Sequence, residues 1–159
     1  MENEGSWGME NFAAVWQRVQ GETAPAPAQE REDVLSRLPE LQYRQVQLLW
    51  ALSGRFRDGR GRELERLCAG EKRHYRRTAM EYFLRTGLRY RPEKDCVLFG
   101  GTAEGLRLAW QQEKKLQKLL ASAAGEGTED WRKESERMAA EDAAHEARLY
   151  DLIRRQMLG

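Results

Sequence analysis

Both histidines of this chain have a carboxylate three residues before them. Glu71 precedes His74, and Asp142 precedes His145. Residues three apart share one face of an α-helix, and in both segments that face also carries the apolar residues. A buried carboxylate is costly unless it is paired or bound to a metal. Two such pairs facing each other in a core therefore favour cations between them, and imidazole with carboxylate suits iron or manganese.

The two pairs lie in segments that align as an internal repeat. In the second half, Glu113 lies 29 positions before Asp142, on the apolar stripe of its own segment. The equivalent position in the first half, 29 before Glu71, is Gln42. A glutamine therefore stands where the repeat would favour an acid.

Glu40 is the acid nearest to that position. Gln42 is in helical phase with Leu38 and Leu49, whereas a residue two positions away lies about 200° around a helix. We therefore expect Glu40 to face away from the site, unless Pro39 distorts the start of the helix.

Four segments have apolar residues at helical spacing, and none shows the alternation typical of a strand. They cover about 30–56, 62–86, 102–124 and 128 onwards. Pro39 predicts a kink or a late start in the first helix, and Thr128 predicts a capped start for the fourth. Glycines separate the first helix from the second and the third from the fourth, while residues 87–101 form a longer connection.

Residues 1–29 form an N-terminal arm. Phe12, Val15, Trp16 and Val19 are spaced as on a short amphipathic helix, and alternating Ala and Pro after residue 23 predict an extended linker. We expect the arm helix to dock on its own bundle or on a sister subunit, and a targeting or partner-docking peptide is the alternative. The domain itself is expected to span residues 30–159.

The bulk composition excludes several classes of protein. The chain has 159 residues, enough for one domain, and its net charge of +1 does not indicate a polyanion binder. Two cysteines without a Cys-x-x-Cys pair argue against a disulfide scaffold or zinc ribbon and fit a reducing cytoplasm. The first residues show no signal peptide, and no apolar run is long enough for a membrane span. Residues 55–91 hold 12 Lys or Arg against 5 acids, which we interpret as a solvated face and not as a nucleic-acid surface.

The complete pattern resembles the ferritin-like superfamily, and within it the rubrerythrin-like di-iron domain. That domain has Glu on helix one, Glu-x-x-His on helix two, Glu on helix three and Glu-x-x-His on helix four. The phrases Ala-Gly-Glu71-x-x-His74 and Ala-Glu-Asp142-x-x-His145 are similar to the second and fourth of these. The resemblance covers about residues 30–157. It implies an all-α, ferritin-like four-helix bundle of two helical hairpins joined by a long crossover.

The resemblance also implies a two-metal site with ligands from all four helices. The implied ligands are Gln42, Glu71, His74, Glu113, Asp142 and His145. By position, Glu71 and Asp142 would bridge two iron ions, with manganese as the alternative metal. His74 and Gln42 would complete the shell of one ion, and the remaining two ligands that of the other.

Three departures from the family pattern affect this site. Gln42 is neutral, Asp142 is one methylene shorter than Glu, and Trp110 stands where rubrerythrins carry a further Glu. Three carboxylates against two divalent cations leave a formal +1 in the interior, which is unfavourable. We therefore predict that the position with Glu113 fills first, and that the position with Gln42 is partial or empty.

The implied function is that of a di-metal protein that reduces peroxide or oxidises ferrous iron. The rubredoxin domain of rubrerythrins has no counterpart here, so the resemblance implies a separate electron donor. It also leads us to expect a homodimer in the cytoplasm, without membrane or nucleic-acid partners. The alternative is a ferritin-like bundle with a degenerate metal site that serves a structural or partner-binding role, its core histidines hydrogen-bonded to acids.

Overall fold

The regular structure of this protein is helical. The computed structural model describes residues 26–93 and 98–158, and within these residues it contains four helices and no strand. The helices are α2 (Ala26–Ser53), α3 (Gly59–Thr86), α4 (Thr102–Ala124) and α5 (Glu129–Leu158). The predicted all-α class with four long helices is therefore confirmed. Among these helices, none is both long and apolar enough to cross a membrane.

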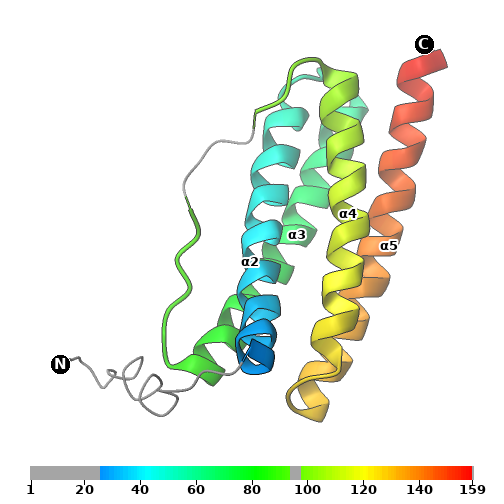
Figure 1. Ribbon diagram of the computed structural model, residues 1–159. Helices are drawn as coiled ribbons and strands as arrows, with labels where there is room; N and C mark the ends of the chain where they lie inside the picture. Colours follow the sequence, from blue (N-terminus) through cyan, green and yellow to red (C-terminus); the bar gives the residue numbers. More distant parts are fainter. Residues whose placement is uncertain (1–25, 94–97, 159) are drawn as a thin grey trace.

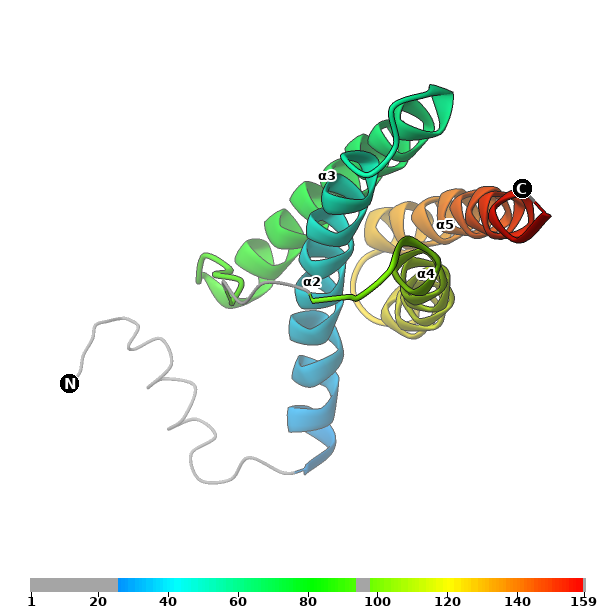
Figure 2. The ribbon, with the colours of Figure 1, turned by 90° about the horizontal axis from the view of Figure 1, so that it is seen from above.

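The four helices form two antiparallel hairpins that pack side by side (Figure 1). α2 pairs with α3, α4 pairs with α5, and α2 also lies against α4. α3 ends and α4 begins at opposite ends of the molecule, and residues 87–93, which follow α3, lie on the outer side of α2 (Figure 1). Viewed from above, the two hairpins stand as separate pairs, with α4 facing α2 (Figure 2). This arrangement is compatible with a four-helix bundle.

Local capping explains where the helices begin and end. The Asp58 side chain accepts a hydrogen bond from the Arg60 N–H at 3.0 Å, so α3 begins at residue 59 and not at about residue 62. Gly87 ends α3 with a positive φ of 74° and donates its N–H to the Phe83 carbonyl at 2.8 Å. The Thr128 hydroxyl accepts from the Trp131 N–H at 3.2 Å, which confirms the predicted cap of α5.

The helix α2 includes two prolines that were expected outside it or at its start. α2 begins at Ala26, so residues 26–29, which were expected in the extended linker, are helical. Pro27 fits there because N–H groups in the first turn have no partner within the helix. The helix also continues through Pro39, so the alternative of a late start is wrong. The predicted arm helix, with Phe12 and Trp16, lies outside the described residues.

The core consists of two apolar clusters with a polar layer between them. One cluster gathers around Leu48, Leu64 and Leu149, and the other around Leu38 and Trp131. Cys68 is buried in the first cluster, as expected for a small core residue. Buried polar side chains from all four helices, among them Gln42, His74, Glu113 and Asp142, lie between the two clusters.

Candidate metal centre

The polar layer contains the acids and histidines that the sequence singled out. Glu71, Glu113 and Asp142 are fully buried, and His74 is 1% exposed. His145 retains 14% exposure of its side chain. The helical phase of both carboxylate-x-x-His pairs thus turns them into the bundle, and each of α3, α4 and α5 contributes to the layer.

Four of these side chains form one tight group. Glu71, Glu113, Asp142 and His145 each offer a ligand atom, and these atoms lie within 4.8 Å of one another. The Nδ1 atom of His145 is 3.0 Å from Glu71 Oε2 and 3.4 Å from Asp142 Oδ1. It is also 3.8 Å from Glu113 Oε1. One imidazole nitrogen therefore faces three carboxylates, and a group of this composition could hold a metal ion.

His74 borders this group from the opposite side. Its Nδ1 atom lies 3.2 Å from Asp142 Oδ1 and 3.5 Å from Glu71 Oε1. The rings of His74 and His145 are stacked, with centroids 5.9 Å apart. Both histidines thus turn Nδ1 towards the same two carboxylates, those of Glu71 and Asp142.

The other ring nitrogen of His74 is held by a residue that the sequence analysis missed. His74 Nε2 lies 2.6 Å from Glu141 Oε1, and Arg137 donates to the second oxygen of Glu141 at 2.7 Å. A carboxylate on the outer nitrogen fixes the tautomer and orientation of a ligating imidazole. The only signal in the sequence was that Glu141 directly precedes Asp142.

Two glutamines of α2 face the same layer. Gln42 is fully buried, and neither its amide oxygen nor its amide nitrogen has a hydrogen-bond partner. Gln45 was missed, although it lies three residues after Gln42 on the same face. Its Nε2 donates to Glu113 Oε2 at 2.9 Å and to the Ala109 carbonyl at 2.8 Å. Gln45 therefore orients Glu113 across the α2/α4 interface.

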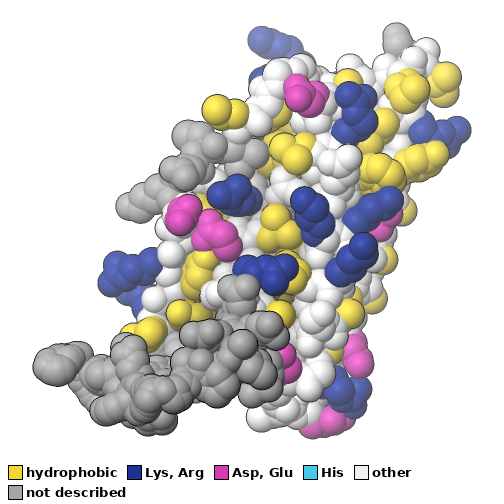
Figure 3. Space-filling model, viewed as in Figure 1, with side chains coloured by type: hydrophobic (Ala, Val, Ile, Leu, Met, Phe, Trp, Pro, Cys, Tyr) yellow, Lys and Arg dark blue, Asp and Glu magenta, His cyan; other side chains and the backbone are white. Residues whose placement is uncertain are grey.

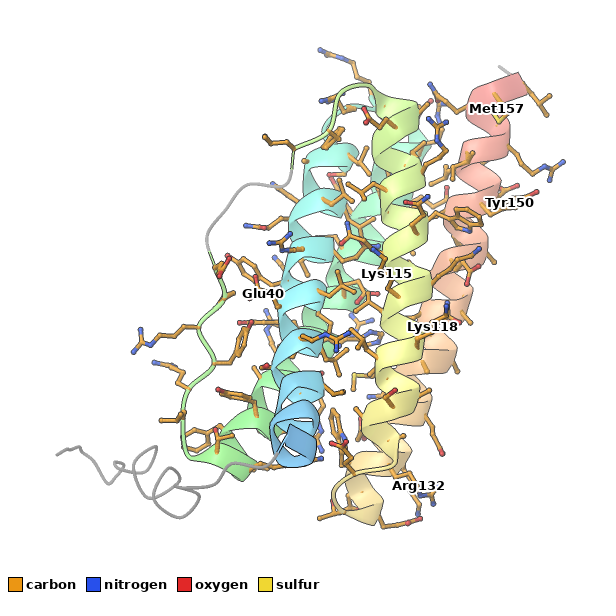
Figure 4. The ribbon with its side chains drawn as sticks, viewed as in Figure 1. Glu40, Lys115, Lys118, Arg132, Tyr150 and Met157 are labelled. Atoms are coloured by element: carbon orange, nitrogen blue, oxygen red, sulfur yellow. The ribbon has the colours of Figure 1, made fainter. Side chains whose placement is uncertain are left out.

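Glu40 does not contribute to this layer. The Tyr90 hydroxyl donates to its carboxylate, and the Glu93 N–H does so at 3.4 Å. Both partners belong to the connection between α3 and α4, and Figure 4 shows Glu40 on the outer side of α2. The expectation that Glu40 faces away from the site is confirmed, so Gln42 and not Glu40 is the inward residue.

The unpaired polar atoms of the layer fit a cation. Glu71 Oε1, Glu113 Oε1, both Asp142 oxygens and His74 Nδ1 are buried without a hydrogen-bond partner. An ionised carboxylate only accepts hydrogen bonds, and leaving it unsatisfied in the interior costs free energy. A bound cation satisfies several such oxygens at once. The residues present therefore fit a metal ion with oxygen and nitrogen ligands.

Gly70 lies against the imidazole ring of His145. A Cβ atom added at Gly70 would lie 3.0 Å from Cε1 and 3.1 Å from Nε2 of His145. These separations are tighter than ordinary carbon contacts, so any side chain at this position would press on the ring. Gly70 precedes Glu71 directly, and it allows α3 and the His145 ring to approach closely.

Burial and the neighbouring charged groups shift the pKa values of all three acids in the layer. Burial raises the pKa of Glu113 well above its usual value, and burial together with the nearby Glu71 carboxyl group raises that of Asp142 to about 6. For Glu71, the neighbouring Asp142 and the two histidines outweigh the effect of burial and lower its pKa.

The pKa values of both histidines are raised, although burial alone would lower them. Burial lowers the pKa of an imidazole, but the nearby carboxylates of Asp142 and Glu71 raise that of His74 to about 10. The nearby carboxylates of Asp142, Glu113 and Glu71 likewise raise the pKa of His145 to about 12. Near neutral pH both imidazoles are therefore protonated in the metal-free protein, and a metal must displace those protons.

Comparison with protein-family models, with curated proteins and with solved structures found no significant match for this chain.

Proposed function

We propose that this chain is a ferritin-like, rubrerythrin-like di-metal protein that binds iron or manganese in its polar layer. One observation carries the proposal. Carboxylate oxygens and an imidazole nitrogen from three helices converge within the core, and several of them have no hydrogen-bond partner. Iron and manganese are the metals that this mixture of carboxylate and imidazole suits best.

The connectivity of the helices supports the same proposal. The first hairpin ends and the second begins at opposite ends of the bundle, and α2 lies next to α4 (Figure 1). In ferritin-like di-metal proteins, side chains from all four helices build the centre in the bundle core. Here α2 contributes Gln42 and Gln45 to the layer, and it is the one helix of the four that contributes no acid.

The proposed chemistry is the reduction of peroxide or the oxidation of ferrous iron. A bound ferrous pair would supply the two electrons that convert one peroxide and two protons to two waters. Glu71 and Asp142 would hold both ions, and Gln45 would keep Glu113 in position. Glu141 would keep the His74 ring oriented through Nε2. The two apolar clusters would limit access of water from either end.

A structural role without metal is the second candidate function, and Gln42 favours it. With Gln42 neutral, the layer holds three carboxylates, and two imidazolium groups pair with Glu71 and Asp142 in the absence of metal. Such a network can serve as a buried polar layer that sets the register of the helices. The bundle would then act through assembly or partner binding.

Metal titration under anaerobic conditions distinguishes the two functions. We expect ferrous or manganous ion to bind tightly at one site per chain and weakly at a second, with an optical change after exposure of the iron form to air. Glu71→Gln should abolish tight binding, whereas Glu65→Gln, an exposed residue on the same helix, should leave it unchanged. A folded protein that binds neither metal, or a Glu71→Gln variant that binds as tightly as the parent, would support the structural role instead.

A further inference from the structure

A groove with an apolar floor and basic walls lies between α2 and α4, on the outside of the bundle. Its volume is about 380 Å³. Leu41 and Leu119 form the floor, and four exposed cations surround it: Arg37, Arg44, Lys115 and Lys118. Figure 3 shows Lys and Arg side chains across the middle of this face, with apolar side chains between them. Lys115 and Lys118 lie along α4 on the same face (Figure 4).

The charge of the groove is strongly one-sided. Among the described residues that line it, Glu40 is the one acid. The Glu40 carboxylate already accepts from Tyr90 and lies 3.7 Å from the guanidinium of Arg44. An occupant that matches this groove must carry carboxylates together with apolar side chains, because four cations and two leucines line it.

The N-terminal segment of the same chain has this composition. Residues 1–20 contain three glutamates and a single basic side chain, Arg18. They also contain large apolar side chains, among them Trp7, Phe12 and Trp16. We propose that residues 1–20 dock in the α2/α4 groove, with their glutamates against the lysines of α4 and their aromatic side chains over the leucine floor.

The length of the chain permits this docking within one molecule. α2 begins at Ala26, so Arg37 and Arg44 lie about 16 Å and 27 Å along the helix at 1.5 Å per residue. Twenty residues span about 30 Å even when fully helical, so the segment can fold back along α2 and cover the groove. A short tether gives it a millimolar effective concentration that a separate acidic peptide lacks.

Docking would place the segment directly over the polar layer. Leu41 adjoins Gln42, and Lys115 lies two residues after Glu113. The groove therefore crosses the α2/α4 seam at the height of the buried acids, and an occupied groove would cover that side of the centre. The inference does not require bound metal, and it can hold whether or not the proposed function does.

Carbodiimide cross-linking of the full-length chain tests the contact directly, because it joins a carboxylate to a lysine only when the two touch. In the monomer-sized fraction we expect Glu2, Glu4 or Glu10 to be joined to Lys115 or Lys118, and not to Lys133 on α5. Arm cross-links to Lys133 alone, or cross-links to Lys115 and Lys118 only between two chains, would overturn docking within one molecule.

The rate of cleavage after Arg18 by an arginine-specific protease, which does not cut after lysine, provides the second readout. The double variant Lys115→Glu/Lys118→Glu should be cleaved about fivefold faster than the parent, because two exposed ion pairs of ordinary strength account for a factor of that order. The matched control Lys133→Glu/Arg154→Glu makes the same charge change on α5 and should match the parent.

Charge exchange completes the test. Adding Glu4→Lys and Glu10→Lys to the groove variant should restore slow cleavage, since the opposite charges then face each other again. Circular dichroism confirms that each variant remains helical. An unchanged cleavage rate in the groove variant, or no recovery after charge exchange, would overturn the proposal.

Discussion

The replacement Gly70→Ala separates metal binding from helix stability. In an ordinary helix interior, alanine stabilises by about 0.5–1 kcal/mol relative to glycine. At Gly70, however, the new methyl would lie 3.0 Å and 3.1 Å from two ring atoms of His145. The ring must then move by a few tenths of an ångström, away from a position in which its Nδ1 atom is 3.0 Å from Glu71 Oε2.

The expected result is a loss of metal affinity without a comparable loss of stability. Disturbing the orientation of a ligating imidazole typically lowers metal affinity about 10- to 100-fold, and we expect at least the lower value at the Glu113/His145 position. Stability of the metal-free protein should stay within about 1 kcal/mol of the parent, because the helix gain offsets the close contact. Titration against a competing chelator measures the first quantity, and urea unfolding with chelator present measures the second.

A second glycine provides the control. A Cβ atom at Gly59 would have Arg62 Nη2 as its nearest neighbour at 3.9 Å, an ordinary contact. Gly59→Ala should therefore leave metal affinity unchanged. The reasoning is refuted if the Gly70→Ala variant binds metal as tightly as the Gly59→Ala variant. The close contact between Gly70 and the His145 ring would then have no role in holding a metal ligand.

Four further predictions concern the same centre. Gln42→Glu should raise the stoichiometry towards two tight metals per chain, because it adds the fourth carboxylate; two equally tight sites in the parent, unchanged by the substitution, would contradict the predicted asymmetry. Glu141→Gln should weaken the metal position at His74 about tenfold, as measured by titration, while Glu134→Gln, a neighbour that also pairs with the same arginine, should not. The metal-free protein should lose stability in urea unfolding as pH rises from 7 to 10. In the folded protein the pKa of His74 is about 10 and that of His145 about 12, against 6.5 for an unfolded histidine. The stability that these protonated histidines add is therefore complete below pH 6.5 and falls as pH rises towards the folded values. Metal binding at pH 7 should accordingly release protons, which calorimetry in buffers of different ionisation enthalpy detects; a release of zero would contradict protonated imidazoles.

Helical periodicity alone was sufficient to turn the acids and histidines of the polar layer inward. The spacing of three between each carboxylate and its histidine, in phase with leucines, turned Glu71 and Asp142 inward. The same argument turned Glu40 outward, as the Tyr90 contact confirms. Such inferences succeed because the direction of a side chain around a helix depends only on position along that helix.

The contacts between helices could be identified only from the tertiary structure. Gln45 reaches Glu113 across 68 positions of sequence, and Glu141 reaches His74 across 67. Neither pair has a local signal, because the distance between two helices depends on how the hairpins cross and on their relative register.

The sequence by itself therefore determined the helices, their inward faces and the acids and histidines of the centre. The tertiary structure decided which of these residues meet: His145 and not His74 joins the three carboxylates within 4.8 Å. It also formed the basic groove, since Arg44 of α2 and Lys115 of α4 become neighbours only when the two hairpins pack. The periodicity of a sequence describes one helix, whereas a site or a groove depends on the distances between several helices.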